Sequence, residues 1–93
     1  MSNVSLPCRS ERTAFRVVAG EGLVMVIDRR ELHRLNTVGA RVFELCDGAT
    51  SVDGIVHAIV REFEVDALTA RQDVDRFVTE LATAGAIVWR EDT

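Results

Sequence analysis

Short apolar runs separated by turn-forming residues fill the first third of the chain, whereas apolar positions at helical spacing fill the rest. Residues 15–19 and 23–27 have the composition of strands, and the stretch 19–22 between them contains two glycines. We therefore predict a β-hairpin. The polar residues 28–31 predict a turn, and residues 32–35 predict a third strand at an edge of the sheet.

The segment 35–48 predicts a first helix with a polar residue at its start and a glycine after its end. Either Asn36 or Thr37 can accept a hydrogen bond from a backbone N–H at the start, and Gly48 can adopt a left-handed conformation. The apolar residues between them recur at helical spacing: Val38, Val42, Leu45 and Cys46, with Phe43 beside them.

Two more helices follow. Thr50 or Ser51 can cap the second, whose apolar residues match one helix face closely. The third is predicted to begin between residues 66 and 69, where residues 69–72 have the spacing of a capping box, and to end at Gly85. The two apolar stripes, which we expect to be buried, are Val52, Ile55, Val56, Ile59, Val60 and Phe63 in the second helix and Val74, Phe77, Val78 and Leu81 in the third.

Three strands followed by three helices predict an α+β domain in which the helices pack on a small antiparallel sheet. Residues 1–12 hold the single proline and show no periodicity, so we expect a flexible N-terminal arm there. The domain itself is predicted over residues 13–90, in which 86–89 form a short strand or an extended tail, and residues 91–93 are predicted to be a frayed end.

The length and composition of the chain favour some classes of function over others. A chain of 93 residues makes one small domain, which favours a binding module over an enzyme with a deep active site. The net charge is -4, and the basic residues, all arginines, are scattered, so we expect no nucleic-acid partner. The longest apolar run is too short to span a bilayer, so we expect a soluble, cytoplasmic protein without a membrane partner.

The residues that usually carry catalysis or bind metal do not form a recognisable pattern. Cys8 and Cys46 lack metal-ligand spacing and are interpreted as free thiols, with Cys46 in the core. His33 is interpreted as a strand histidine, and Trp89 as a residue that closes one edge of the core. We therefore expect no catalytic residue, no metal site and no cofactor.

The predicted edge strand is the element best suited to bind a partner. Its outer backbone N–H and C=O groups lack partners within the sheet, so a second extended chain can pair with them. Such pairing is one common way in which proteins bind peptides.

The order of the motifs resembles that of the PqqD family. The resemblance rests on Leu35-Asn36, Gly39, the run 43–48 that ends in Asp-Gly, the helix over 52–63, and Asp73-Val74 followed by Gly85; it covers residues 14–89. It implies a winged-helix-like fold with a three-stranded antiparallel sheet and three helices. Family members are recognition elements for the precursors of ribosomally synthesised and post-translationally modified peptides (RiPPs).

The resemblance also implies a function and a site. The chain would be a peptide chaperone that binds the leader of a precursor peptide and presents it to a radical SAM or other modifying enzyme, in pyrroloquinoline quinone biosynthesis or another RiPP pathway. The leader would add as a strand to the third strand, in a groove against the third helix. The implied peptide-binding residues are Glu31, Leu32, His33, Arg34 and Leu35 from the strand, and Arg71, Val74, Asp75 and Val78 from the helix.

Two other readings remain open on the sequence. A winged-helix DNA-binding regulator can have the same elements, although Asp73, Asp75 and Glu80 offset Arg71 and Arg76 on the third helix. A structural subunit of a larger enzyme would bury the excess apolar residues in an interface. A homodimer formed through the strand hairpin is compatible with the peptide-chaperone reading.

Overall fold

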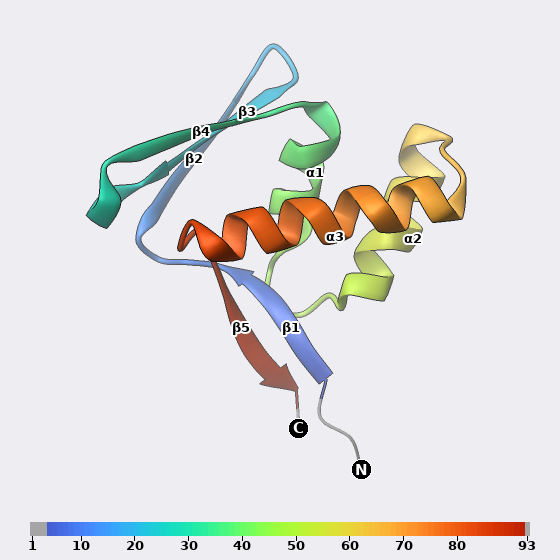
Figure 1. Cartoon of the computed structure of the whole chain (residues 1–93). Helices are drawn as coiled ribbons and strands as arrows, with labels where there is room; N and C mark the ends of the chain where they lie inside the picture. The colour runs from blue at the N-terminus through green and yellow to red at the C-terminus, as the bar shows by residue number, and fades with distance from the viewer. Residues whose placement is uncertain (1–3, 93) are drawn as a thin grey trace.

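The computed structural model describes residues 4–92, which form an α+β domain of two antiparallel sheets and three α-helices (Figure 1). The larger sheet has the strand order β2-β3-β4, and β1 pairs with β5 in a separate two-stranded ribbon. The elements are β1 Val4–Arg9, β2 Thr13–Val18, β3 Glu21–Val26, the 3-10 turn η1 Ile27–Arg29, β4 Glu31–Leu35, α1 Thr37–Leu45, α2 Val52–Phe63, α3 Ala67–Thr83 and β5 Ile87–Asp92.

The predicted hairpin is confirmed, and its turn fixes the register of the sheet. Ala19 and Gly20 both have positive φ, 53° and 82°, as the two central residues of a type I′ turn require. Val18 therefore lies opposite Glu21, and Phe15 opposite Val24. The turn is two residues long, shorter than the stretch 19–22 that the sequence predicts, and β2 and β3 extend up to it.

The helices begin at capping residues, and for two of them the N-cap is one of the two alternatives that the sequence offers. The side chains of Asn36 and Ser51 accept hydrogen bonds from the backbone N–H groups three residues later, at 2.8 and 3.1 Å. The capping box predicted at residues 69–72 is wrong, because Asp66 is the N-cap of α3 and accepts a bond from the Thr69 N–H at 2.8 Å. An ionised carboxylate accepts such a bond more strongly than a hydroxyl does.

The core lies between the inner face of the β2-β3-β4 sheet and the three helices. Phe43 of α1 is fully buried against Phe15 of β2, with ring centroids 4.9 Å apart in an edge-to-face arrangement. The apolar stripes of α2 and α3 join this core, as predicted, through residues such as Ile55, Ile59 and Val74. Cys46 is also buried there, and both cysteines are free thiols.

The prediction of a flexible arm is wrong for most of its length. Residues 4–9 form β1, which pairs along its whole length with β5, and the predicted tail is likewise wrong for residues 91 and 92, which belong to β5. Leu6 and Pro7 are buried, and the Gly48 N–H donates to the Pro7 carbonyl at 3.0 Å. Residues 1–3 and 93 lie outside the described part of the chain.

Hydrogen bonds connect the ribbon to α1. The Arg9 guanidinium donates to the carbonyl oxygens of Phe43, at 3.0 Å, and Glu44, which lie in the last turn of the helix. The Arg9 backbone N–H donates to the Cys46 carbonyl at 2.9 Å. No helix within residues 4–92 is long and apolar enough to cross a membrane.

Candidate functional site

β4 lies at an edge of the larger sheet, so one side of its backbone has no strand beside it within residues 4–92. The Ile27 N–H donates to the Arg12 carbonyl at 2.9 Å, which identifies the residues of β2 and β3 that exchange hydrogen bonds. Alternation along an antiparallel ladder then directs the backbone groups of Glu31, His33 and Leu35 toward β3. The N–H and C=O groups of Leu32 and Arg34 point to the free edge.

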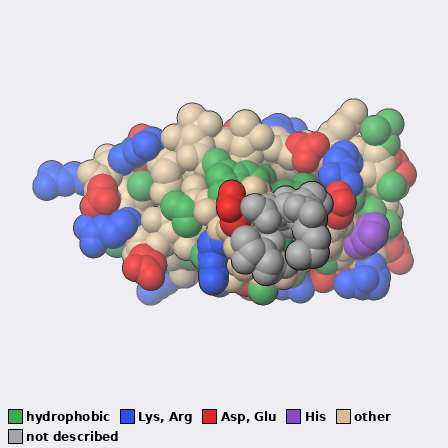
Figure 2. Space-filling view, turned by 90° about the horizontal axis from the view of Figure 1, so that it is seen from below, with side chains coloured by type: hydrophobic (Ala, Val, Ile, Leu, Met, Phe, Trp, Pro, Cys, Tyr) green, Lys and Arg blue, Asp and Glu red, His purple; other side chains and the backbone are tan. Residues whose placement is uncertain are grey.

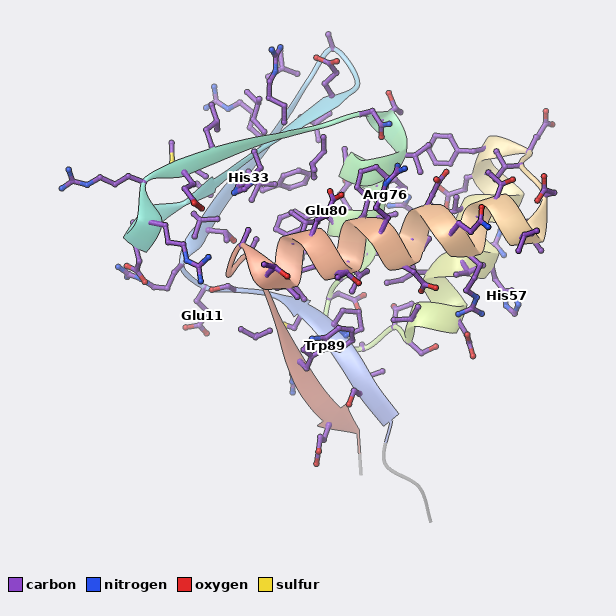
Figure 3. The ribbon with its side chains drawn as sticks, viewed as in Figure 1. Glu11, His33, His57, Arg76, Glu80 and Trp89 are labelled. Atoms are coloured by element: carbon purple, nitrogen blue, oxygen red, sulfur yellow. The ribbon has the colours of Figure 1, made fainter. Side chains whose placement is uncertain are left out.

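The side chains of β4 alternate between the two faces of the sheet. Glu31, His33 and Leu35 lie on the inner face, in line with Val26, Val24 and Gly22 of β3, and Leu35 is buried. His33 is partly buried, and its Nε2 lies 3.7 Å from a carboxylate oxygen of Glu31. No hydrogen-bond partner for this nitrogen lies within the described residues. Figure 3 shows Glu80 and Arg76 on the side of α3 toward the sheet.

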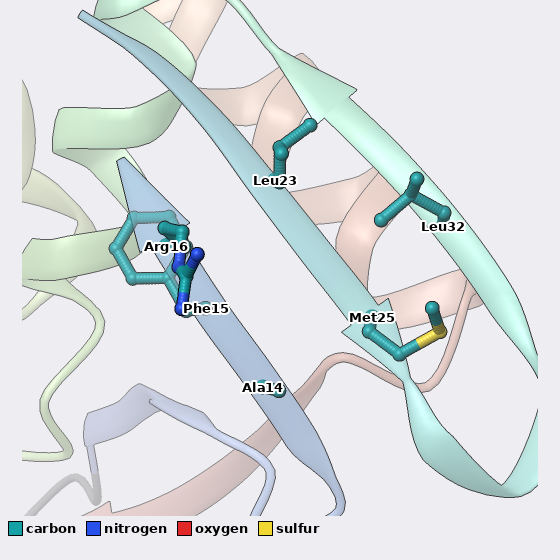
Figure 4. A pocket seen from close by; sticks show the side chains of 6 residues that line it. All are labelled: Ala14, Phe15, Arg16, Leu23, Met25 and Leu32. Carbon is teal, nitrogen blue, oxygen red and sulfur yellow. The ribbon is translucent and has the colours of Figure 1, made fainter. Parts of the chain in front are cut away.

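The outer face of the sheet carries a shallow hollow of about 230 Å³, lined by Ala14, Phe15, Arg16, Leu23, Met25 and Leu32. Leu23, Met25 and Leu32 project from the same side of the sheet, away from the helices (Figure 4). Leu32 is 56% exposed and Met25 37% exposed. This face is therefore apolar at its centre and directly adjoins the free edge of β4.

Arginines surround the larger sheet. The Arg34 guanidinium on the outer face lies 3.7 Å from Glu21, and Arg12 pairs with Asp28 at 2.7 Å. The hydrogen bonds from Arg12 hold the pKa of the Asp28 carboxyl below its ordinary value. Arg29 of η1 donates to the Thr83 carbonyl at 3.0 Å and so joins the start of β4 to the end of α3.

The residues predicted on α3 divide between the core and the exposed side of the helix. Val74 and Val78 are core residues, because the apolar stripe of the helix packs inward. Arg71 pairs instead with Asp53 of α2, and Asp75, one turn later, is exposed on the same side of α3. The strand part of the predicted set forms β4 itself: Glu31, Leu32, His33, Arg34 and Leu35.

The neighbouring strands contribute to the outer face residues that the sequence patterns did not identify. Arg16, Leu23 and Met25 join Leu32 and Arg34 on the outer face because the two-residue turn sets the register. Gly20 adopts positive φ readily and carries a weak form of this signal, whereas Ala19, whose Cβ disfavours positive φ, carries none. If the turn is assigned to these two residues alone, the register of β2 and β3 follows, and Arg16 and Leu23 then lie opposite each other on one face.

The surface charges of the molecule are mixed. In the view of Figure 2, the acidic and basic side chains are interspersed around the molecule. On α3, Arg76 lies 3.6 Å from Asp73 and above the ring of Phe77, at 4.9 Å from its centroid. This interspersion differs from the single-sign basic surface that a DNA-binding helix typically presents.

The model of the family described as coenzyme PQQ synthesis protein D (PqqD) matches residues 21–87 of this chain. The chain belongs to the PqqD family. The match runs from the start of β3 through β4 and the three helices to the first residue of β5. The free edge of β4 therefore lies within the part of the chain that is characteristic of PqqD proteins.

A solved structure has the same fold as this PqqD-family chain. It is described as TbiB1 in complex with the TbiA(beta) leader peptide, and it has a TM-score of 0.77 and 24% sequence identity over 86% of this chain and 93% of TbiB1. A search of curated proteins gives no match. The predicted three-stranded antiparallel sheet and three helices are confirmed, and the β1–β5 ribbon is an element that the sequence patterns did not predict.

Proposed function

We propose that this PqqD-family chain is a non-catalytic protein that binds the leader of a ribosomally made precursor peptide and presents it to a modifying enzyme. The observation that carries the proposal is the free edge of β4, where the N–H and C=O groups of Leu32 and Arg34 point away from the sheet. An extended leader would add there as a fourth strand. The pathway would be pyrroloquinoline quinone biosynthesis or another RiPP pathway, and the enzyme a radical SAM or other maturase.

Two observations support this choice of ligand. The family model that matches this chain is described as coenzyme PQQ synthesis protein D, and the structure of TbiB1, which shares the fold, is described as a complex with a leader peptide. A peptide that pairs through its main chain needs only an extended conformation, so recognition can tolerate changes in many leader residues.

The geometry of β4 provides a direct test with proline. Leu32→Pro removes an N–H that points to the free edge and places a proline ring there, while the ladder to β3 stays intact. The ligand is a synthetic peptide with the leader sequence of a precursor that is encoded next to the gene of this protein. We expect the variant to fold and to bind this peptide at least about tenfold more weakly. Isothermal titration calorimetry measures the affinity, and far-UV circular dichroism checks the fold.

Two controls separate the backbone from other effects. Leu32→Ala removes the side chain and keeps the N–H, so its loss of affinity should be smaller than that of Leu32→Pro. Val17→Pro places proline in β2, at the opposite edge of the sheet. The N–H of Val17 also points away from the sheet, so this variant should bind the leader as the unmodified protein does. Equal binding by Leu32→Pro and the unmodified protein would exclude strand addition at β4.

Backbone amide shifts test the location independently. Titration of the labelled protein with the same leader should shift the amide resonances of β4, above all those of Leu32 and Arg34. Shifts confined to α2 or to the β1–β5 ribbon would contradict the proposed site.

A further inference from the structure

The outer face of the sheet forms two cross-strand rows that end at the free edge of β4. One row is Ala14, Met25 and Leu32, and the other is Arg16, Leu23 and Arg34. The first row is apolar. The second has a leucine between two arginines.

A strand that adds to β4 extends each row by one residue. Side chains that lie next to each other on one face of a sheet interact, and an opposite charge or a second apolar group stabilises such a pair. The added residue beside Leu32 therefore gains from being apolar, since it continues over the hollow that Met25 and Leu32 line. The added residue beside Arg34 gains from being acidic.

The contacts of Arg34 leave it able to bind a new acid. Its side chain is 77% exposed, and its distance to Glu21 is 3.7 Å, which is the geometry of a weak surface pair. Arg16 lies in the same row and has no ion pair with any of the side chains that the structure describes, residues 5–91. An acidic residue on the added strand would thus face a row with two positive charges and one negative charge at its side.

The inner face disfavours an acid at the intervening position. The residue between the two outward-facing ones would point to the same side as Glu31 and His33. A carboxylate there would lie near the Glu31 carboxylate, and like charges across neighbouring strands are destabilising. Glu80 and Arg76 both lie on the side of α3 toward the sheet (Figure 3), and Asp73, 3.6 Å from Arg76, offsets the positive charge of that arginine.

On the basis of the proposed function, we infer that the leader segment bound by this chain carries an acidic residue and a large apolar residue two positions apart, with a non-acidic residue between them. The acidic residue pairs with Arg34 and the apolar residue with Leu32, on the outer face of the sheet. The direction of the added strand decides which of the two comes first. Arg34 and Leu32 are the residues that determine specificity.

The inference is tested with a phage-displayed library of random 12-residue peptides, selected on the full chain. Peptides that bind the unmodified protein but not Leu32→Pro are those that use the edge of β4. Among these, we expect enrichment of the acid, non-acid, apolar pattern in either order. Selection on Arg34→Glu should replace the acid of the pattern by lysine or arginine.

A charge swap tests the same pair in one selected peptide. Changing its acid to lysine should weaken binding to the unmodified protein by about fivefold, and Arg34→Glu should restore most of that loss. Arg61→Glu on α2 is the matched control and should restore none of it.

The outcomes distinguish the two levels of the proposal. Peptides that depend on the β4 edge but lack the pattern, or a pattern that does not change with Arg34→Glu, overturn the inference and leave strand addition intact. If every selected peptide binds Leu32→Pro as well as the unmodified protein, the proposed function fails, and the inference fails with it.

Discussion

Asn36 connects the end of β4 to the start of α1, and its side chain decides how that helix begins. The Asn36 oxygen accepts a 2.8 Å hydrogen bond from the Gly39 N–H, which would otherwise lack a partner at the helix start. We expect Asn36→Ala to lower the free energy of unfolding by about 1 kcal/mol. Urea denaturation measures the change. Thr37→Ala, at the other cap position that the sequence allows, should change stability by less than about 0.5 kcal/mol.

Cys46 illustrates how burial suppresses the chemistry of a side chain. Loss of hydration raises the pKa of its thiol from the ordinary value of 9.0 to about 12. In the unfolded chain the thiol ionises near its ordinary value. Ionisation of this thiol should therefore have no effect on the free energy of unfolding below pH 9 and should lower it as the pH rises from 9 toward 12.

Iodoacetamide labelling checks the same property of Cys46. At pH 8 the native protein should be alkylated at the half-buried Cys8, and Cys46 should react only after urea is added. Mass spectrometry of digested protein separates the two sites. Equal labelling of both cysteines in the native protein would show that Cys46 is not shielded by the core.

At the scale of elements, the contact between α1 and α3 depends on the absence of a side chain. A Cβ atom added at Gly39 would lie 2.6 Å from Cε1 of the Phe77 ring. We expect Gly39→Ala to lower the free energy of unfolding by about 1 to 2 kcal/mol, because overpacking outweighs the gain of about 1 kcal/mol in helix propensity.

The matched control for Gly39 is a glycine in another helix. At Gly54 of α2 an added Cβ meets only side-chain atoms near the helix start, at 3.0 Å or more, so Gly54→Ala should be close to neutral or stabilising. Thermal unfolding of both variants measures the two changes in stability. A stabilised Gly39→Ala protein would show that α1 and α3 separate easily.

Local signals predicted most of the elements correctly, and long-range pairing accounts for the errors. The caps Asn36 and Ser51 and the hairpin follow from residues close together in the chain. β1 could not be found in this way, because Pro7 and the polar residues around it give no period, and its partner β5 lies at the other end of the chain. Only pairing with that strand makes β1 a strand.

The candidate site likewise has one part that the sequence could predict and one part that it could not. The edge position of β4 follows from strand order, so the sequence could predict it. The α3 residues could not be assigned by resemblance alone, because Val74 and Val78 belong to the same apolar stripe that forms the core. Burial and peptide contact are competing roles for one side chain, and packing determines which of them it has.

At the scale of the whole molecule, the β1–β5 ribbon is expected to unfold together with the helical core. Leu6 is 7% exposed, and Leu6→Ala should lower the free energy of unfolding by about 2 kcal/mol or more, since it removes buried apolar volume. The exposed Ser5 on the same strand provides the control, and Ser5→Ala should have little effect.

The single tryptophan allows the cooperativity to be measured. Trp89 lies on β5 opposite Pro7, so its fluorescence reports on the ribbon, while far-UV circular dichroism reports mainly on the helices. Coincident urea transitions, both shifted by Leu6→Ala, are expected for one cooperative unit. An earlier fluorescence transition would mean that the ribbon opens independently of the core.

The pairing of Val4 with Asp92 has a consequence for the attachment of other groups. The two strands place both ends of the described chain side by side, at the end of the molecule opposite the larger sheet (Figure 1). An affinity tag, a surface anchor or a fused enzyme domain can therefore be joined at either end without covering β4. A hairpin linker of about 2 to 5 residues could even close the chain into a ring, which would leave the free edge of β4 as accessible as before.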